Sequence, residues 1–407
     1  GSVEVMCQTA QALAQQHQLS FRLDDHRSRP PTDTEATTIK RPTTATKLAI
    51  DIVASPRPGV AAALNQGLQL CLAPFVARMD ADDICAPGRF LSQLQVLMFN
   101  PQLRVVGTQS ILFRQQQEGP NNDDPSPMTI SAAYAPRNNE TILSTNELPF
   151  FHHDILSLAS DRNNEEEDET QLWARTCLPP TDPGLTAWAM LFSCCLSHPS
   201  VMFRHDDENA IHYNESSQYA EDYELWLRMT SEDAQSATSL PRIGLWHRKH
   251  RISRQRRQRS ENQRDESIDL AREAMGRILK ETAPVDQEAV RVLLHCSSQD
   301  PDGTVSLSVL DRSASLLWSL MTQFLARNYS LTHEEKELVR LDAKERLGEL
   351  ATRVAVEHGS LVNKSIAWQL WCKECPERGL DQLTLLTSCS REPLVRSTSL
   401  RRNFRCA

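Results

Sequence analysis

Three carboxylates lie within four positions, directly after a short apolar stretch. Residues 75–79, FVARM, have the pattern of a strand, and Asp80, Asp82 and Asp83 follow it. Carboxylates crowded at the end of a buried strand are costly unless a cation or hydrogen-bond donors compensate their charge. Alternate carboxylates suit a hard divalent cation that also holds phosphate oxygens, as Mg²⁺ or Mn²⁺ does. A solvated turn before a helix would explain the same residues without a metal.

Two other uses of these carboxylates do not fit their spacing. A calcium loop that begins at Asp80 would need Gly at its sixth position and Glu at its twelfth, where the sequence has Cys85 and Leu91. An aspartyl-phosphate enzyme with the same Asp-x-Asp would carry a companion Thr after the second Asp, and none follows.

The composition is that of a globular protein with a sizeable core. The chain has 407 residues, of which 40% are hydrophobic and 24% charged, with a net charge of -9. An acidic balance argues against a protein that coats nucleic acid, so we expect no nucleic-acid partner. Eleven cysteines without a repeated spacing argue against a disulfide framework. No signal-peptide or membrane-helix pattern is present, from which we expect a cytoplasmic location.

The acidic cluster lies within an alternation of strands and helices. Apolar patterning predicts strands at 47–54 and 103–108 and helices at 60–72 and 88–99. This alternation is typical of an α/β fold, with parallel pairing as the default and functional groups at the carboxyl ends of strands. The helical period of 88–99 places five apolar side chains on one face: Phe90, Leu91, Leu94, Leu97 and Met98.

Polar intervals and a long helical stretch divide the rest of the chain. We expect an α/β domain at 1–259, interrupted by flexible insertions at 22–46 and 114–180, because both are poor in core-forming residues. Helical periodicity then predicts a helical C-terminal region at 260–390, followed by a disordered tail at 391–407.

One helix start within the C-terminal region is specified by its sequence. Thr332 and Glu335 have the spacing of a capping box, in which each residue bonds the backbone of the other.

Four phrases of the sequence resemble, in order, segments of glycosyltransferase family 2. The first runs from RPGVAAALNQG through MDADD and the PGRFLSQLQ helix to VVGT; the others are LSHPSVMFR, YAEDYELWLRM and LWHRKHRIS. Together they cover about 50–115 and 180–260. The family pattern begins with an apolar strand that ends in Pro-x-x-Asn, then a helix, and then a second strand that ends in Asp-Asp-Gly-Ser. Gly1-Ser2 matches the end of that phrase, so we expect the chain to lack the family's N-terminal strands.

The resemblance implies a GT-A fold, a Rossmann-like mixed sheet flanked by helices, here with an all-helical C-terminal extension. It also implies an inverting transfer of a hexosyl or N-acetylhexosaminyl group from a nucleotide-sugar donor, with UDP as the first candidate. Mn²⁺ or Mg²⁺ would be held by Asp80, Asp82 and His250. Asp222 would be the general base that takes the acceptor proton, as an inverting displacement requires.

The resemblance further implies two groups of binding residues. Four would bind the donor: Arg57, Asn65, Asp80 and Asp83. Three would lie on the acceptor side: His198, Glu221 and Trp226. Core packing is an alternative for His198 and Trp226, helix capping for Glu221, and membership of a basic face for His250.

Other functions stay open at this stage. An inactive or truncated relative could act as a sugar-nucleotide-binding or scaffold protein. A metal-dependent phosphohydrolase could use the same Asp-x-Asp, but it leaves HPSVMF and EDYELW unexplained. The acceptor could be a glycan, a lipid or a protein. The basic run at 248–259 could make a peripheral membrane contact or form a solvated helix start.

Overall fold

The computed structural model describes residues 53, 55, 57–114, 173–205, 211–248, 254–280, 285–294 and 306–357. Several predictions therefore lie outside the described residues: the insertion at 22–46, most of the strand at 47–54, His250 and the tail at 391–407.

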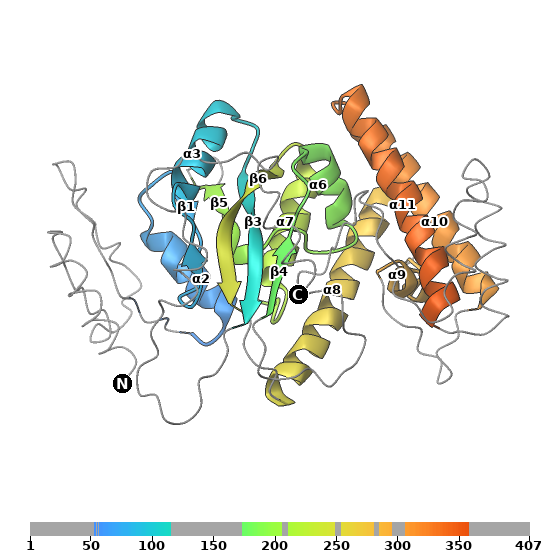
Figure 1. Cartoon of the computed structure of the whole chain (residues 1–407), viewed down its shortest axis with the longest axis horizontal. Coiled ribbons are helices and arrows are strands. Elements are labelled where there is room, and N and C mark those ends of the chain that lie inside the picture. The colour runs from blue at the N-terminus through green and yellow to red at the C-terminus, as the bar shows by residue number, and fades with distance from the viewer. Residues whose placement is uncertain are drawn as a thin grey trace, which may run out of the picture.

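Helices and strands alternate in the first half of the described chain, and helices alone follow (Figure 1). The elements, in chain order, are α2 (Val60–Leu70), β1 (Phe75–Ala77), β2 (Ile84–Cys85), α3 (Arg89–Phe99), β3 (Val105–Arg114), β4 (Trp173–Cys177), α6 (Pro183–Met190), the 3₁₀ helix η3 (His198–Ser200), β5 (Met202–Arg204), α7 (Glu221–Glu232), β6 (Ala237–Arg248), α8 (Arg254–Leu279), α9 (Gln287–Leu293), α10 (Leu307–Arg327) and α11 (His333–Glu357).

The strands form one mixed sheet in the order β1-β5-β3-β6-β2, with β4 also paired to β3. β3 and β6 run parallel, and the other pairings are antiparallel. The α/β alternation is confirmed, but the expected parallel pairing of β1 with β3 is wrong. The two strands run in the same direction but are not neighbours, because β5, from a distant part of the sequence, lies between them and runs antiparallel to both. Within the interval expected to be an insertion, residues 173–177 form β4.

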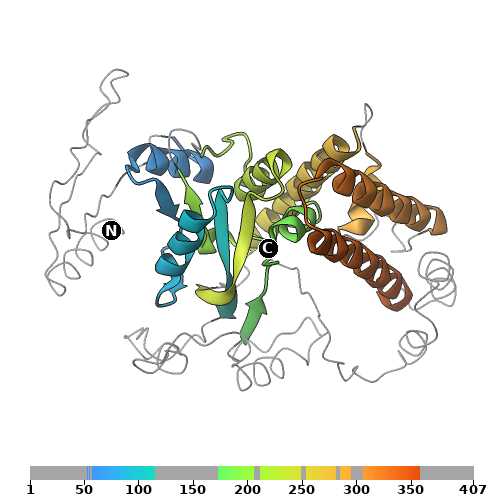
Figure 2. The same ribbon diagram turned by 90° about the horizontal axis from the view of Figure 1, so that it is seen from above.

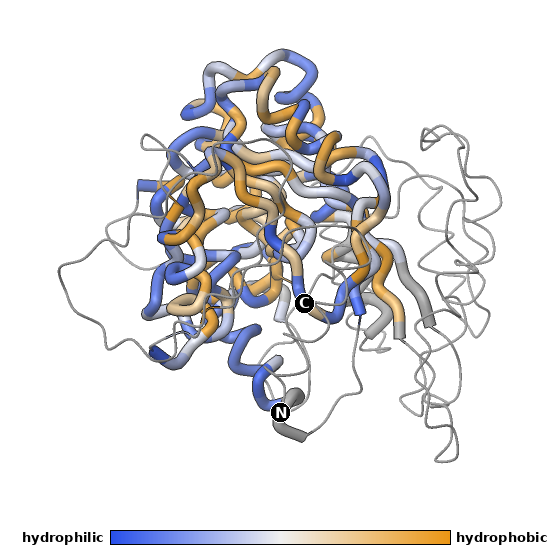
Figure 3. The backbone as a smooth tube through the Cα atoms, turned by 90° about the vertical axis from the view of Figure 1, so that its left-hand side faces the viewer, coloured by the Kyte–Doolittle hydropathy of each residue, from blue (hydrophilic) through white to orange (hydrophobic). Residues whose placement is uncertain are grey.

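Helices cover the sheet on both sides (Figures 1 and 2). α2 and α3 lie on one side, and α6 and α7 lie on the other, where α8 to α11 pack against them. The hydrophobic segments gather in the interior around the sheet (Figure 3). The buried core continues from α6 and α7 into the C-terminal helices. The boundary between 259 and 260 stays a prediction.

The buried face of α3 differs from the predicted one. Arg89, Gln93 and Leu97 are buried in this helix. Three of the predicted apolar residues are exposed instead: Phe90, Leu91 and Met98. The prediction was wrong because it counted only apolar residues.

Arg89 and Gln93 are buried because they donate hydrogen bonds to backbone carbonyls that α3 covers. The Arg89 guanidinium donates to the carbonyls of Arg78 and Val201, at 2.9 and 3.3 Å. The Gln93 amide donates to carbonyls in β3 and η3, at 2.6 and 2.9 Å. Buried carbonyls require donors, and these two side chains supply them.

The C-terminal helices are attached through a buried polar contact. Trp188 of α6 donates from Nε1 to Asp342 of α11 at 2.8 Å, and Arg346 donates to the same carboxylate oxygen at 2.6 Å. The capping box is confirmed: Thr332 N donates to Glu335 Oε2 at 2.6 Å, and Glu335 N donates to Thr332 Oγ1 at 3.2 Å. Among the described residues, no helix combines the length and apolar character needed to cross a bilayer.

The parallel ladder between β3 and β6 contains an irregularity. Thr108 pairs with Leu240 but Gln109 pairs with Ile243, so the register shifts beside Gln109. Gly244 lies close to Thr108 at this point, and a Cβ at position 244 would come within 2.7 Å of the Thr108 Cβ. Glycine permits this close approach, and the shift sets the register of the last residues of β6.

We expect Gly244→Ala to destabilise the protein by about 1–3 kcal/mol, because the added methyl group would overlap the Thr108 side chain. Urea denaturation followed by circular dichroism measures the change. The matched control is Gly67→Ala in α2, where a Cβ meets nothing within 4 Å and helix propensity favours alanine by about 1 kcal/mol. Equal stability of Gly244→Ala and the wild type would contradict a tight strand contact.

Candidate active site

The acidic loop between β1 and β2 is fixed at both ends. At its start, Arg78 N donates to the Val201 carbonyl at 3.0 Å, and within it Asp83 N donates to the Asp80 carbonyl at 3.4 Å. At its end, Ile84 of β2 pairs with Trp246 of β6. Because these strands are antiparallel, the residue before Ile84 lies opposite the residue after Trp246. Asp83 is therefore placed across from His247.

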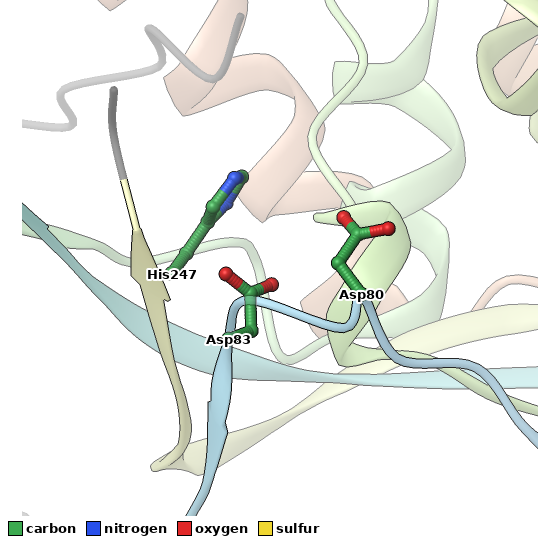
Figure 4. A group of neighbouring side chains, drawn as sticks. All are labelled: Asp80, Asp83 and His247. Carbon is green, nitrogen blue, oxygen red and sulfur yellow. The ribbon is translucent and has the colours of Figure 1, made fainter. Parts of the chain in front are cut away.

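Asp80, Asp83 and His247 converge (Figure 4). One potential ligand atom from each lies within 4.8 Å of the others. We call these three residues the acidic trio. Asp83 Oδ1 accepts from the backbone N–H of Arg248 at 2.8 Å, whereas Oδ2 is buried and accepts from none of the described residues.

The environment of Asp83 fits a cation. Burial raises the pKa of Asp83 to about 6, and the neighbouring charges of Asp80 and Asp82 add to that rise. Two carboxylates and an imidazole form a ligand set suited to Mn²⁺, and carboxylates also suit Mg²⁺. Asp82 is exposed, and its carboxylate lies outside the trio. The backbone carbonyl of Asp82 accepts from Arg248 Nε at 3.0 Å.

A second carboxylate site lies at the start of α7 and consists of Glu221 and Asp222. Asp222 Oδ1 accepts from Tyr223 N at 2.8 Å, and Oδ2 accepts from the Cys194 thiol at 3.8 Å. Burial raises the pKa of Asp222 to about 6, and the charge of Glu221 adds to the rise. Burial also raises the pKa of Glu221. A carboxyl group that titrates near neutral pH is suited to accepting a proton.

His198 and Trp226 are buried in the packed interior. His198 Nε2 and the Tyr213 hydroxyl are 2.9 Å apart, and the His198 and Trp226 rings meet edge to face at 6.1 Å. Burial, with a smaller contribution from the charge of Arg78, lowers the pKa of His198 well below its usual value. Trp226 is fully buried in this arrangement.

Arg57 and Asn65 hold the loop before α7. Arg57 forms a bidentate ion pair with Glu215, at 2.6 and 2.8 Å. Asn65 of α2 exchanges two hydrogen bonds with the backbone of Tyr213, at 2.8 and 2.9 Å, and donates to Glu215 at 3.1 Å. These two residues are therefore joined to each other through this loop and not to the trio.

A surface cavity of about 510 Å³ lies beside the start of α7. Its lining comes from the first residues of α2, the loop before α7, and α8, with Tyr219, Arg259 and Asn262 among the contributors. The Asn262 amide donates to the Tyr219 hydroxyl at 3.1 Å. The charge of Arg259 acts on Glu221, which places this cavity near the second carboxylate site.

Residues 27–149, which include the acidic loop, match the sequence model of glycosyl transferase family 2. This match identifies a glycosyltransferase family 2 region in the first half of the chain. It is similar to the bifunctional glycosyltransferase pgtA of Dictyostelium discoideum, with 25% identity over 363 residues, 83% of this chain and 42% of pgtA. It is also similar to the amylovoran biosynthesis glycosyltransferase AmsE of Erwinia amylovora, with 26% identity over 173 residues, 42% of this chain and 44% of AmsE.

A third relative matches over a shorter stretch. An uncharacterized glycosyltransferase of Haemophilus influenzae is 42% identical over 69 residues, 17% of this chain and 26% of that protein. The chain spans less than half the length of each of these three relatives. The described residues thus have the mixed α/β sheet of a GT-A fold, followed by a helical C-terminal part.

Sequence reasoning on the family 2 pattern did not find His247. It selected His250, which lies outside the described residues. His247 joins the trio only through the pairing of β2 with β6, and β2 is two residues long. A strand that short leaves no periodic signal, so the sequence offers no direct indication of this neighbour.

We expect Asp222→Asn to stabilise the folded protein at neutral pH by about 2–3 kcal/mol. The raised pKa means that the folded state holds its proton more strongly than the unfolded state. The wild type therefore loses stability as the pH rises from about 4 to about 6, and the amide avoids that loss. Urea denaturation at pH 7.5 and at pH 4 measures the difference, which should shrink at pH 4.

The control for this substitution is Asp269→Asn on the exposed surface of α8, where an i,i+3 pair with Arg272 contributes little. If Asp222→Asn were less stable than the wild type at pH 7.5, the buried Asp222 carboxylate would not lower the stability of the folded protein as predicted.

Proposed function

We propose that the protein transfers a sugar from a nucleotide-diphosphate donor, with UDP-sugars as the first candidates, to an acceptor hydroxyl with inversion at the anomeric carbon. The acidic trio is the observation that carries this proposal. Two carboxylates and a histidine converge on one point, and a buried oxygen of Asp83 has no hydrogen-bond donor among the described residues. The match of residues 27–149 to glycosyl transferase family 2 supports a nucleotide-sugar donor.

Mn²⁺ or Mg²⁺ fits the trio as a cofactor. Asp80, Asp83 and His247 would hold the ion, and Asp82 and His250 are further candidates from the sequence. When bound, such an ion neutralises negative charge on the diphosphate. Arg78 and the backbone N–H of Arg248 keep the two carboxylates of the trio in place, through contacts of 2.6 and 2.8 Å.

Asp222 is the proposed general base. In the transfer, the acceptor oxygen forms a bond to the anomeric carbon while the bond from that carbon to the diphosphate breaks. The acceptor proton passes to Asp222, and the nucleoside diphosphate leaves with the bonding electrons. The hydrogen bonds from Tyr223 N and the Cys194 thiol fix the carboxylate without supplying a positive partner, which keeps it basic.

The acceptor is expected on the α7 side of the site. Glu221 and the cavity lined by Tyr219, Arg259 and Asn262 support this placement. A glycan, a lipid or a protein hydroxyl would each satisfy the chemistry. Residues Arg57 and Asn65 would act on the donor through the loop that they hold, and the basic run at 248–259 is the candidate for a peripheral membrane contact.

The trio predicts which variants lose the donor site. We expect Asp83→Asn and His247→Ala to weaken Mn²⁺-dependent UDP binding at least tenfold, since each removes one converging ligand. Asp82→Asn should have a smaller effect, because its carboxylate lies outside the trio. Calorimetric titration of UDP with and without Mn²⁺ measures all three, and the control is Asp269→Asn on α8.

Other outcomes would lead to other conclusions. A larger loss for Asp82→Asn than for Asp83→Asn would overturn the trio as the metal site. Metal-dependent UDP binding without transfer from any sugar donor would favour the sugar-nucleotide-binding or scaffold function. Release of phosphate from the nucleotide without an acceptor would favour a phosphohydrolase.

The pKa of Asp222 predicts the pH profile of transfer. The carboxylate is ionised above about pH 6, so kcat should fall as the pH drops below that value, by about tenfold per pH unit. Asp222→Asn should lower kcat by roughly 10²- to 10⁴-fold and leave Mn²⁺-dependent UDP binding within twofold. A flat profile between pH 5 and 7, or an active Asp222→Asn protein, would exclude Asp222 as the base.

A further inference from the structure

Arg78 stands at the end of β1 with its backbone and one side of its guanidinium held in place. Its N–H donates to the Val201 carbonyl at 3.0 Å, and its carbonyl accepts from Arg89 at 2.9 Å. Arg78 Nη2 contacts Asp80 Oδ1 at 2.6 Å. The side chain is only 15% exposed, so the guanidinium is largely buried beside the acidic loop and does not lie on the outer surface.

The second terminal nitrogen of Arg78 is not used by the fold. Nη1 is buried and donates no hydrogen bond to any described residue. Buried donors are almost always paired, so an unpaired guanidinium nitrogen needs a reason. Nη1 lies beside the acidic loop and can donate to a bound ligand without releasing Asp80 from Nη2.

The charge of Arg78 also reaches the second carboxylate site. Burial raises the pKa of Asp222 and of Glu221, and in both cases the positive charge of Arg78 opposes that rise. Arg78 contacts Asp80 of the trio directly. This guanidinium is therefore in contact with the trio and within electrostatic range of the start of α7.

The inference about Arg78 rests on the proposed function. If that function holds, a guanidinium within range of both sites is close to where the donor sugar would lie. The diphosphate would lie at the trio, and the base must stand on the opposite side of the anomeric carbon. The transferred sugar ring must then lie between them. A guanidinium carries only donors, so it selects ligand oxygens with available lone pairs.

We infer that Arg78 binds the transferred sugar of the donor, with Nη1 donating a hydrogen bond to a hydroxyl or carboxylate oxygen on the sugar ring. The residue thereby distinguishes the sugar nucleotide from the nucleoside diphosphate that remains after transfer. It is a specificity-determining contact, separate from the ligands of the trio.

The test compares two affinities in the same protein. Calorimetry with Mn²⁺ gives the Kd of UDP and the Kd of the sugar nucleotide that the wild type binds best among UDP-glucose, UDP-galactose, UDP-N-acetylglucosamine and GDP-mannose, with GDP replacing UDP for the last. In Arg78→Gln, the ratio of the sugar-nucleotide Kd to the nucleotide Kd should rise about 10- to 100-fold, the range expected for a hydrogen bond from a charged donor. The Kd of the nucleotide alone can rise because Arg78 also supports Asp80, but such a loss is shared by both ligands and cancels in the ratio.

Two further variants keep the result interpretable. Arg78→Lys retains the charge near Asp80 but has one ammonium group in place of the fork, so it should also raise the ratio. Arg104→Lys is the matched control, because Arg104 makes a comparable 2.6 Å pair with Glu232 away from the site. Its ratio should equal that of the wild type.

The outcomes separate the inference from the proposed function. Parallel losses for both ligands, or an unchanged ratio, would overturn a sugar contact and leave Arg78 as a support for Asp80. A folded wild type that binds no nucleotide with Mn²⁺ would overturn the proposed function itself, and the inference with it.

Discussion

A fully buried arginine, Arg89, holds together the backbone segments on which the site is built. Its guanidinium donates to the carbonyl of Arg78, at the start of the acidic loop, and to that of Val201, before β5. Gln93 links η3 to β3 in the same way. Burying a cation is costly, and this cost lowers the pKa of Arg89. Charge-assisted hydrogen bonds to several carbonyls offset it. These hydrogen bonds fix the ends of short strands in addition to the bonds within the sheet.

Burial of charge is also costly for the carboxylates of the site. Asp83 and Asp222 are both buried enough to raise their pKa to about 6, and neither has a basic partner at hydrogen-bond distance that would restore it. Folding alone would favour an apolar or paired residue at each position. The two sites differ in their neighbours: Asp83 has a second carboxylate and an imidazole, whereas Asp222 has a thiol and a backbone amide. That difference separates a group suited to a cation from one suited to a proton.

The sequence predicted this protein well wherever a local pattern carried the information. The helices of the second half, the capping box at Thr332 and the acidic cluster at 80–83 could be recognised from spacing, whereas Asp222 was selected by the family resemblance and stays a prediction as the base. The buried face of α3 could not, since Arg89 and Gln93 are buried by carbonyls that come from distant segments. His247 could not either, because the register of a two-residue strand decides its place. In both cases long-range backbone pairing determines the outcome, and side-chain periodicity carries no record of it.

The contact between Trp188 and Asp342 has a consequence for how the chain folds. Residues 188 and 342 are far apart in sequence, yet they share one hydrogen bond inside one continuous core. If the chain were cut before α8, the indole N–H would lose its acceptor and the apolar flank of α6 would meet water. Such a fragment would exchange a buried surface for an aggregation-prone one. The part of the protein that bears the carboxylates thus reaches its final form only after α11 has been synthesised.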